Sequence, residues 1–155
     1  MPRLLLPLLL LAALAAPAQK YDGPRPPKPD LPYLKHADNL VPTEAVVAKE
    51  EGKKGSMTFV IDGANSSAVT PLASPIFLLK ADKIVPETLE LYRLESKNGR
   101  RSVVPTKTPP IRLEATRLTP DMIWKIEVDE SLDPGEYSLT VRDDPSNQAW
   151  CFQVR

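Results

Sequence analysis

The sequence predicts an all-β fold, an antiparallel β-sandwich of seven to nine short strands preceded by a proline-rich extended arm. Two observations support this prediction. From Ser56 onward, apolar and polar residues alternate with a period of two, and turn signals separate the alternating runs at short intervals. In addition, 18 of the 155 residues are proline, which disfavours a helical bundle because proline breaks helix interiors.

The first residues are typical of a secretory signal peptide. A basic start at Met1–Arg3 is followed by the uncharged Leu/Ala-rich run Leu4–Ala16 and by an A-x-A cleavage site at residues 16–18. The run is shorter than the roughly 20 residues that a membrane-spanning helix needs. We therefore expect residues 1–18 to be removed, the chain to be secreted or periplasmic, and the mature part to contain no membrane span.

Residues 19–42 are predicted to form a proline-rich arm or linker. Five prolines lie within 14 residues, and they favour an extended polyproline II conformation: Pro24, Pro26, Pro27, Pro29 and Pro32. We interpret the segment as a semi-rigid spacer. A recognition arm remains an alternative, because two P-x-x-P patterns occur in it.

The remaining residues, 43–155, are expected to form one β-sandwich domain. The first strand is expected over Ala45–Lys49, although Thr43 could instead cap a short helix, and Glu50–Gly55 is expected to be a charged loop. Met57, Phe59 and Ile61 then alternate with polar or smaller residues, which is typical of a half-buried strand. A short apolar run bounded by Pro75 and Asp82, Ile76–Lys80, predicts a buried strand.

Asn98-Gly99 is the strongest hairpin signal, because both residues tolerate the positive φ angles of a type I′ turn. It joins predicted strands at Leu89–Ser96 and Arg100–Val104. The later strands are expected at Ile111–Ala115, Ile123–Val128, Glu136–Arg142 and Trp150–Arg155. In these strands the bulky apolar and aromatic residues should face a dry core, while the residues between them face water.

The segment Leu132–Val141 reads L-x-P-G-x-Y-x-L-x-V, which resembles a late strand and its preceding turn in secreted immunoglobulin-like and fibronectin-type modules. The resemblance covers the last third of the chain. It implies an immunoglobulin-like sandwich and a hydrogen bond from the Tyr137 hydroxyl to nearby backbone. Periplasmic copper-binding sandwiches have a similar strand and bind metal through His, but His36 is the only histidine here, so the resemblance does not imply copper binding.

Three residues could carry chemistry: His36, Asp62 and Cys151. His36, near Asp38, could be a general base or a metal ligand, but a surface histidine is the simpler interpretation. Asp62-Gly63 faintly resembles the loop of aspartic proteases, yet it lacks the intervening Ser or Thr and a second copy, so we interpret it as a turn. Cys151 lies between Trp150 and Phe152 and is expected to be a buried thiol. No catalytic, cofactor-binding or metal residue is assigned, and no cofactor is expected.

These observations predict an exported, non-catalytic β-sandwich module with a binding or structural role at the cell envelope. The 20 acidic and 20 basic residues balance, which argues against a nucleic-acid partner, so the partner should be a protein or an envelope component. One alternative is a small exported metal-binding protein or hydrolase that uses His36, Asp62 or the turn carboxylates. Another is a subunit of a cell-surface assembly joined through its arm or an edge strand.

Overall fold

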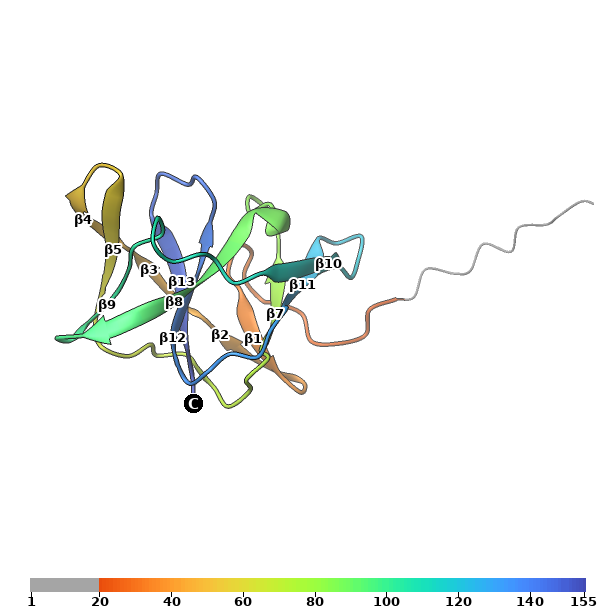
Figure 1. Ribbon diagram of the computed structural model, residues 1–155. Helices are drawn as coiled ribbons and strands as arrows, with labels where there is room; N and C mark the ends of the chain where they lie inside the picture. Colours follow the sequence, from red (N-terminus) through yellow and green to blue (C-terminus); the bar gives the residue numbers. More distant parts are fainter. Residues whose placement is uncertain (1–19) are drawn as a thin grey trace, which may run out of the picture.

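The computed structural model describes residues 20–155, so the predicted signal peptide, residues 1–18, lies outside the described residues. The described residues form thirteen β-strands and one short 3-10 turn, η1 (Pro86–Thr88), with no α-helix among them (Figure 1). Within residues 20–155, no helix is long and apolar enough to cross a membrane. The strands belong to two antiparallel sheets, which confirms the predicted all-β class.

The smaller sheet has five strands in the order β10-β11-β7-β1-β2. Its strands are β1 (Tyr33–His36), β2 (Asn39–Pro42), β7 (Ile76–Lys80), β10 (Leu113–Arg117) and β11 (Ile123–Val128). The apolar run of β7 lies between β1 and β11, and such a central position explains why its residues Phe77, Leu78 and Leu79 are fully buried.

The larger sheet has eight strands and curls into a half-barrel, with the order β3-β13-β12-β8-β9-β5-β4 and with β6 beside β13. Its strands are β3 (Glu44–Val47), β4 (Lys49–Lys53), β5 (Ser56–Asp62), β6 (Val69–Thr70), β8 (Leu89–Lys97), β9 (Arg100–Val103), β12 (Gly135–Val141) and β13 (Gln148–Val154). The pairing of β6 with β13 is parallel. Only Ala48 separates the edge strands β3 and β4 in the chain, so the chain itself passes from one edge of the curl to the other.

The main core lies between the two sheets. Phe77 of the smaller sheet meets Phe152 of β13 edge to face, with 5.0 Å between the ring centroids, and Tyr137 of β12 stacks on Phe152 at 5.6 Å. Such aromatic pairs stabilise a core beyond the burial of their area. Leu91 and Leu139 complete the contact from the larger sheet, and both are fully buried.

A second, smaller core fills part of the concave side of the half-barrel. It consists of Ala48, Ile61, Leu94, Ala149 and Cys151, with further apolar residues packed against it. Strands β8, β12 and β13 therefore bury side chains on both faces. This arrangement corrects the expectation that the residues between the bulky ones face water, because Glu136 and Ser138 of β12 are only 5% and 2% exposed. The curl of the sheet, which a single strand's alternation does not reveal, encloses them.

The number of strands is thirteen, whereas the sequence predicted seven to nine. Residues 33–42, predicted as arm, form β1 and β2 of the smaller sheet. The prediction of a loop over Glu50–Gly55 was wrong, because β4 extends to Lys53 and pairs with β5. Charged side chains suit this strand because it is an edge strand and is exposed throughout.

The Asn98-Gly99 hairpin is confirmed. Lys97 pairs with Arg100, and the φ angles of Asn98 and Gly99 are 53° and 72°, as a type I′ turn requires.

The described part of the proline-rich segment is attached to the domain. The Asp30 N–H donates to the Lys80 carbonyl at 2.9 Å. The Asp30 carboxylate accepts hydrogen bonds from the backbone N–H groups of Asp82, Lys83 and Ile84 at 3.0–3.1 Å. Burial alone would raise the pKa of Asp30, but these three donors outweigh it and lower the pKa. The arm therefore docks along the end of β7.

Candidate functional site

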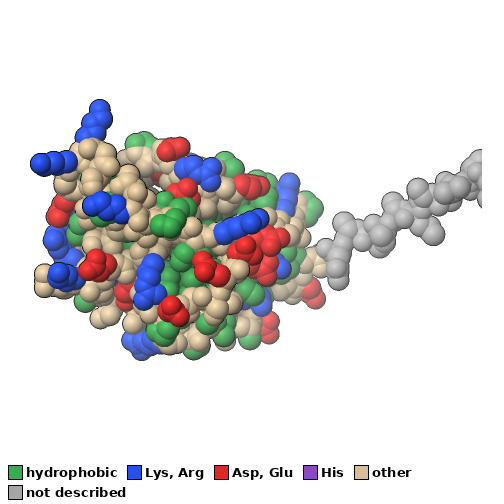
Figure 2. Space-filling model, viewed as in Figure 1, with side chains coloured by type: hydrophobic (Ala, Val, Ile, Leu, Met, Phe, Trp, Pro, Cys, Tyr) green, Lys and Arg blue, Asp and Glu red, His purple; other side chains and the backbone are tan. Residues whose placement is uncertain are grey.

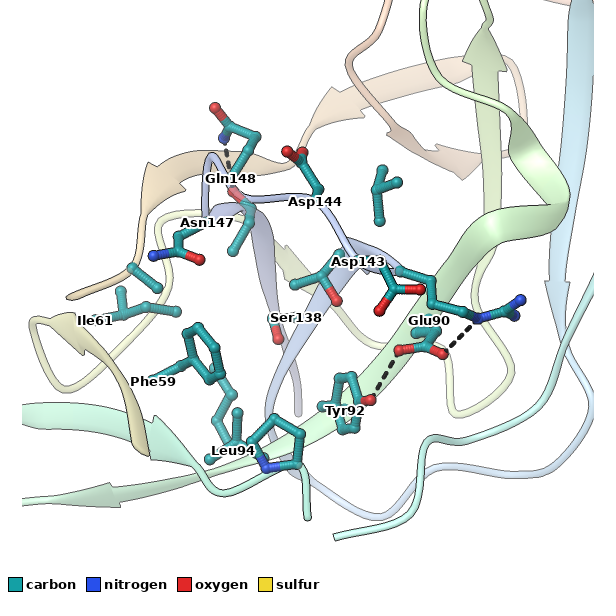
Figure 3. A pocket seen from close by; sticks show the side chains of 17 residues that line it. Phe59, Ile61, Glu90, Tyr92, Leu94, Ser138, Asp143, Asp144, Asn147 and Gln148 are labelled. Atoms are coloured by element: carbon teal, nitrogen blue, oxygen red, sulfur yellow. Dashed lines mark hydrogen bonds and ion pairs between the residues drawn. The ribbon is translucent and has the colours of Figure 1, made fainter. Parts of the chain in front are cut away.

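The concave side of the half-barrel contains a cavity of about 390 Å³ that opens to solvent (Figure 3). It lies between strands β5, β8, β9, β12 and β13 and the turn that joins β12 to β13. A cavity of this size is at the lower end of the range for small-ligand sites, which is about 300–1,000 Å³.

The floor of the cavity is apolar. It is formed by Phe59 and Ile61 of β5, Leu94 of β8, Val103 of β9 and Ala149 of β13. Phe59 pairs with Val103 across the antiparallel ladder, and residues opposite one another in such a ladder project from the same face. The period of two places Ile61 on that face as well. The apolar residues of three neighbouring strands thus converge on the inside of the curl.

One wall of the mouth is a fixed polar group of three side chains. The Tyr92 hydroxyl donates to Oε2 of Glu90 at 2.8 Å, and Arg142 pairs with Oε1 of Glu90 through Nε at 3.0 Å (Figure 3). Burial, with a smaller effect of the Glu90 carboxylate, raises the pKa of Tyr92 to about 12. Tyr92 is therefore a neutral hydrogen-bond donor at physiological pH, and both oxygens of Glu90 are occupied.

Two further carboxylates lie on the turn after β12. Asp144 accepts hydrogen bonds from the Ser146 N–H at 2.9 Å and from the Ser146 hydroxyl at 2.8 Å, so it stabilises the turn. Asp143 has a φ of 59° and is exposed, and in Figure 3 its carboxylate points to the side of the cavity where Glu90 and Tyr92 lie. Among the described residues that line the cavity, Arg142 is the one cationic side chain, so the mouth is acidic.

The acidity is local. On the face shown in Figure 2, Lys and Arg side chains are interspersed with Asp and Glu side chains, so that face does not present charge of a single sign. The equal numbers of acidic and basic residues in the sequence are therefore also mixed in space on this face.

A buried polar cluster adjoins the inner core. Arg101 is opposite Ile61 in the ladder, and its side chain is only 2% exposed. Its Nη2 donates to Oε1 of Glu44 at 2.7 Å and to the Asp62 carbonyl at 2.9 Å, and its Nε donates to the Gly63 carbonyl at 2.9 Å. Arg101 thereby connects β9 to β3 and to the turn that follows β5.

Two glutamates fix the loop after that turn. Glu136 accepts the Ser66 N–H on both oxygens at 3.1 and 3.2 Å, and Glu44 accepts the Ser67 N–H at 2.7 Å. Burial raises the pKa of Glu136 and outweighs the Ser66 hydrogen bonds. Burial would raise the pKa of Glu44 too, but the hydrogen bonds from Arg101 and Ser67 outweigh it and lower the pKa. The cluster contains two carboxylates for one guanidinium.

The residues considered for catalysis or metal binding are not brought together. His36 lies in the smaller sheet, where its Nε2 is 2.9 Å from Oγ1 of Thr70. Asp62 is on the half-barrel and pairs with Lys49 at 2.8 Å on the surface. Within residues 20–155, no group of three or more His, Cys, Asp or Glu side chains is arranged to hold a metal ion.

Cys151 is confirmed as a buried free thiol, and burial raises its pKa to about 12.

Sequence reasoning did not find the cavity, although one signal for it exists. Strand β8 has apolar residues on both of its faces: Leu89 and Leu91 lie on one face, and Tyr92 and Leu94 lie on the other. Such a strand is buried on both sides, which requires a second apolar layer beyond the main core. The alternation alone could not show that the layer leaves an opening.

Comparison with protein-family models, curated proteins and solved structures gave no match for this chain.

Proposed function

We propose that this protein is an exported, non-catalytic β-sandwich module of the immunoglobulin-like type, and that it binds a small ligand in the half-barrel cavity. The observation that carries the proposal is the solvent-open cavity itself, with an apolar floor and a mouth of fixed polar groups. Binding sites for small molecules have this combination, because the apolar part supplies affinity and the few polar groups supply orientation.

Other parts of the proposal rest on further observations. The Tyr137 hydroxyl donates to the Asp133 carbonyl at 2.7 Å, which is the kind of bond that the immunoglobulin-like resemblance implies. Export rests on the signal peptide that the sequence predicts at residues 1–18. A role at the cell envelope follows from export.

The alternatives have less support. A hydrolase or metal-binding protein that uses His36 and Asp62 would need them in a shared site, but they lie in different sheets and have other partners. Within residues 20–155 the turn carboxylates are not arranged in a group of three or more that could hold a metal ion. An assembly subunit joined through its arm would need a free arm, but Asp30 fixes the end of the arm to the domain. Joining through an edge strand stays an alternative, for which β2 and β10 at the edges of the smaller sheet are the candidates.

The test is binding of a neutral apolar dye, 1-N-phenylnaphthylamine, whose fluorescence rises in an apolar site. We expect saturable binding by the native protein. The Val103→Trp variant should fill part of the cavity and weaken binding by about tenfold, the equivalent of ~1.4 kcal/mol. Val47→Trp is the matched control, because Val47 is 65% exposed and does not line the cavity.

Both variants should keep the native circular dichroism spectrum and urea midpoint. If the native protein does not bind the dye, or if both tryptophan variants bind it as the native protein does, the cavity is not the binding site and the proposal is wrong.

A further inference from the structure

This inference rests on the proposed function and names the class of ligand: we propose that the half-barrel cavity binds a small cationic amphiphile. Such a ligand has an apolar body that fits within about 390 Å³, such as an alkyl chain of about eight carbons, and carries an ammonium or guanidinium group. The apolar body would lie on the floor between Phe59, Leu94 and Ala149, and the cation would lie at the mouth beside Asp143.

The charge of the residues at the cavity mouth determines which charge the ligand should carry. Three carboxylates line the cavity, those of Glu90, Asp143 and Asp144, against the one guanidinium of Arg142. Arg142 pairs with Glu90 through Nε at 3.0 Å, so the charges of this pair compensate each other and the charges of the two aspartates stay uncompensated. A carboxylate or phosphate ligand would therefore meet uncompensated negative charge, whereas a cation would compensate it.

The hydrogen bonds at the mouth select Asp143 as the cation's contact. Both oxygens of Glu90 are already occupied, by Tyr92 and by Arg142. Asp144 is engaged by Ser146. The Asp143 carboxylate forms no ion pair with another residue of the described part of the chain, and its position on the turn directs it toward the cavity (Figure 3). Of the three carboxylates that line the cavity, that of Asp143 is therefore the one without a hydrogen-bond or ion-pair partner among the described residues.

The volume limits the size of the apolar body. About 390 Å³ is close to the smallest cavities that hold small ligands, so a long acyl chain would extend beyond the mouth. Within that limit, the burial of each CH₂ group favours binding, so a chain of several carbons supplies most of the affinity. The cation then supplies the preference for one charge over another.

The test compares three probes that have the same chain and differ in the head group: octylamine, octanol and octanoate. Each is titrated into the full mature chain at neutral pH, and its dissociation constant is measured by displacement of 1-N-phenylnaphthylamine. We expect octylamine to bind most tightly and octanoate least tightly, with about a tenfold difference between them, because the acidic mouth attracts the ammonium group and repels the carboxylate, and exposed charge interactions of this kind are weak. The difference should shrink at high salt.

The variant Asp143→Asn removes the charge and keeps the shape, and asparagine tolerates the positive φ of this position. We expect it to bind octanol as the native protein does and to lose most of the preference for octylamine over octanol. Asp38→Asn is the matched control, because Asp38 is also exposed on a turn but does not line the cavity. It should leave all three constants unchanged.

The outcomes separate this inference from the proposed function. If octanol binds but octylamine binds no more tightly than octanoate, or if Asp143→Asn leaves the preference intact, the cationic ligand class is wrong while the cavity remains a binding site. If the dye binds but none of the three probes displaces it below the limit set by solubility or micelle formation, the cationic amphiphile is wrong while the cavity remains a binding site; if the dye itself does not bind, both proposals are wrong.

Discussion

Replacing Arg101 with methionine should be one of the most destabilising single changes in this protein. Methionine replaces the aliphatic part of the arginine side chain but can form none of the three hydrogen bonds that the guanidinium makes. The carbonyls of Asp62 and Gly63 would each lose a charged donor, and Glu44, whose side chain is only 18% exposed, would lose its counter-charge. Removing one partner of a buried ion pair costs about 3–5 kcal/mol because the other charge stays buried.

The lost hydrogen bonds lead to a similar estimate of the loss in the free energy of unfolding. Hydrogen bonds that involve a charged group contribute about 1.5–3 kcal/mol each, and the variant loses three of them. The apolar contacts of the methionine side chain offset part of this loss. A loss of about 3–5 kcal/mol is a large part of the roughly 5–15 kcal/mol by which native domains are stable. The measurement is the free energy of unfolding from urea titrations followed by circular dichroism.

Arg100 offers a matched control in the same strand. It pairs with Glu51 at 2.9 Å, but both side chains are about half exposed, so Arg100→Met should change stability by less than about 1 kcal/mol. The double variant Arg101→Met with Glu44→Gln should regain part of the loss, because it removes the unpaired carboxylate. If Arg101→Met costs no more than Arg100→Met, the buried cluster does not stabilise the half-barrel.

Three further outcomes are expected. Folding raises the pKa of Glu136, so its contribution to stability is fully present below the unfolded-state pKa and is lost as pH rises through the folded-state pKa. Glu136→Gln should therefore gain stability relative to the native protein as pH rises above about 4.3, the ordinary pKa of glutamate, and urea midpoints that shift equally at all pH values would contradict this. Cys151 should react with Ellman's reagent only after unfolding, because the thiol is buried with a pKa of about 12; rapid labelling of the native protein would contradict it. Tyr137→Phe should cost about 1–2 kcal/mol, because it removes the bond to the Asp133 carbonyl and the acceptor of Arg93; an unchanged urea midpoint would show that these bonds are not stabilising.

The sequence was most informative where local chemistry dictates local structure. The positive φ angles of Asn98 and Gly99 belong to the turn itself, so the hairpin could be predicted from two residues. The apolar run Ile76–Lys80 likewise predicted a buried strand, since little else can bury so many large residues in succession.

The sequence was least informative where tertiary structure overrides local preference. The charged segment Lys49–Lys53 forms a strand because β5 offers it a pairing partner, not because its residues favour strands. Glu136 looked like a water-facing residue, but the curl of the sheet buries it beside Ser66. The cavity depends on the same curl of the sheet. From the sequence, the residues of β8 that line it could be recognised only as parts of a strand that is buried on both faces.

The separation of the two cores has a consequence for how the protein opens. Strand β5 contributes Phe59 and Ile61 to the inner core and β9 contributes Val103, but neither strand contributes to the core between the sheets, and β4 is exposed throughout. We therefore expect these three strands to open before the sandwich behind them, once the Arg101–Glu44 pair breaks, and their amide protons to exchange with solvent before those of β12 and β13. Such partial detachment would widen the entrance above Phe59, which gives a bulky molecule a way in without global unfolding.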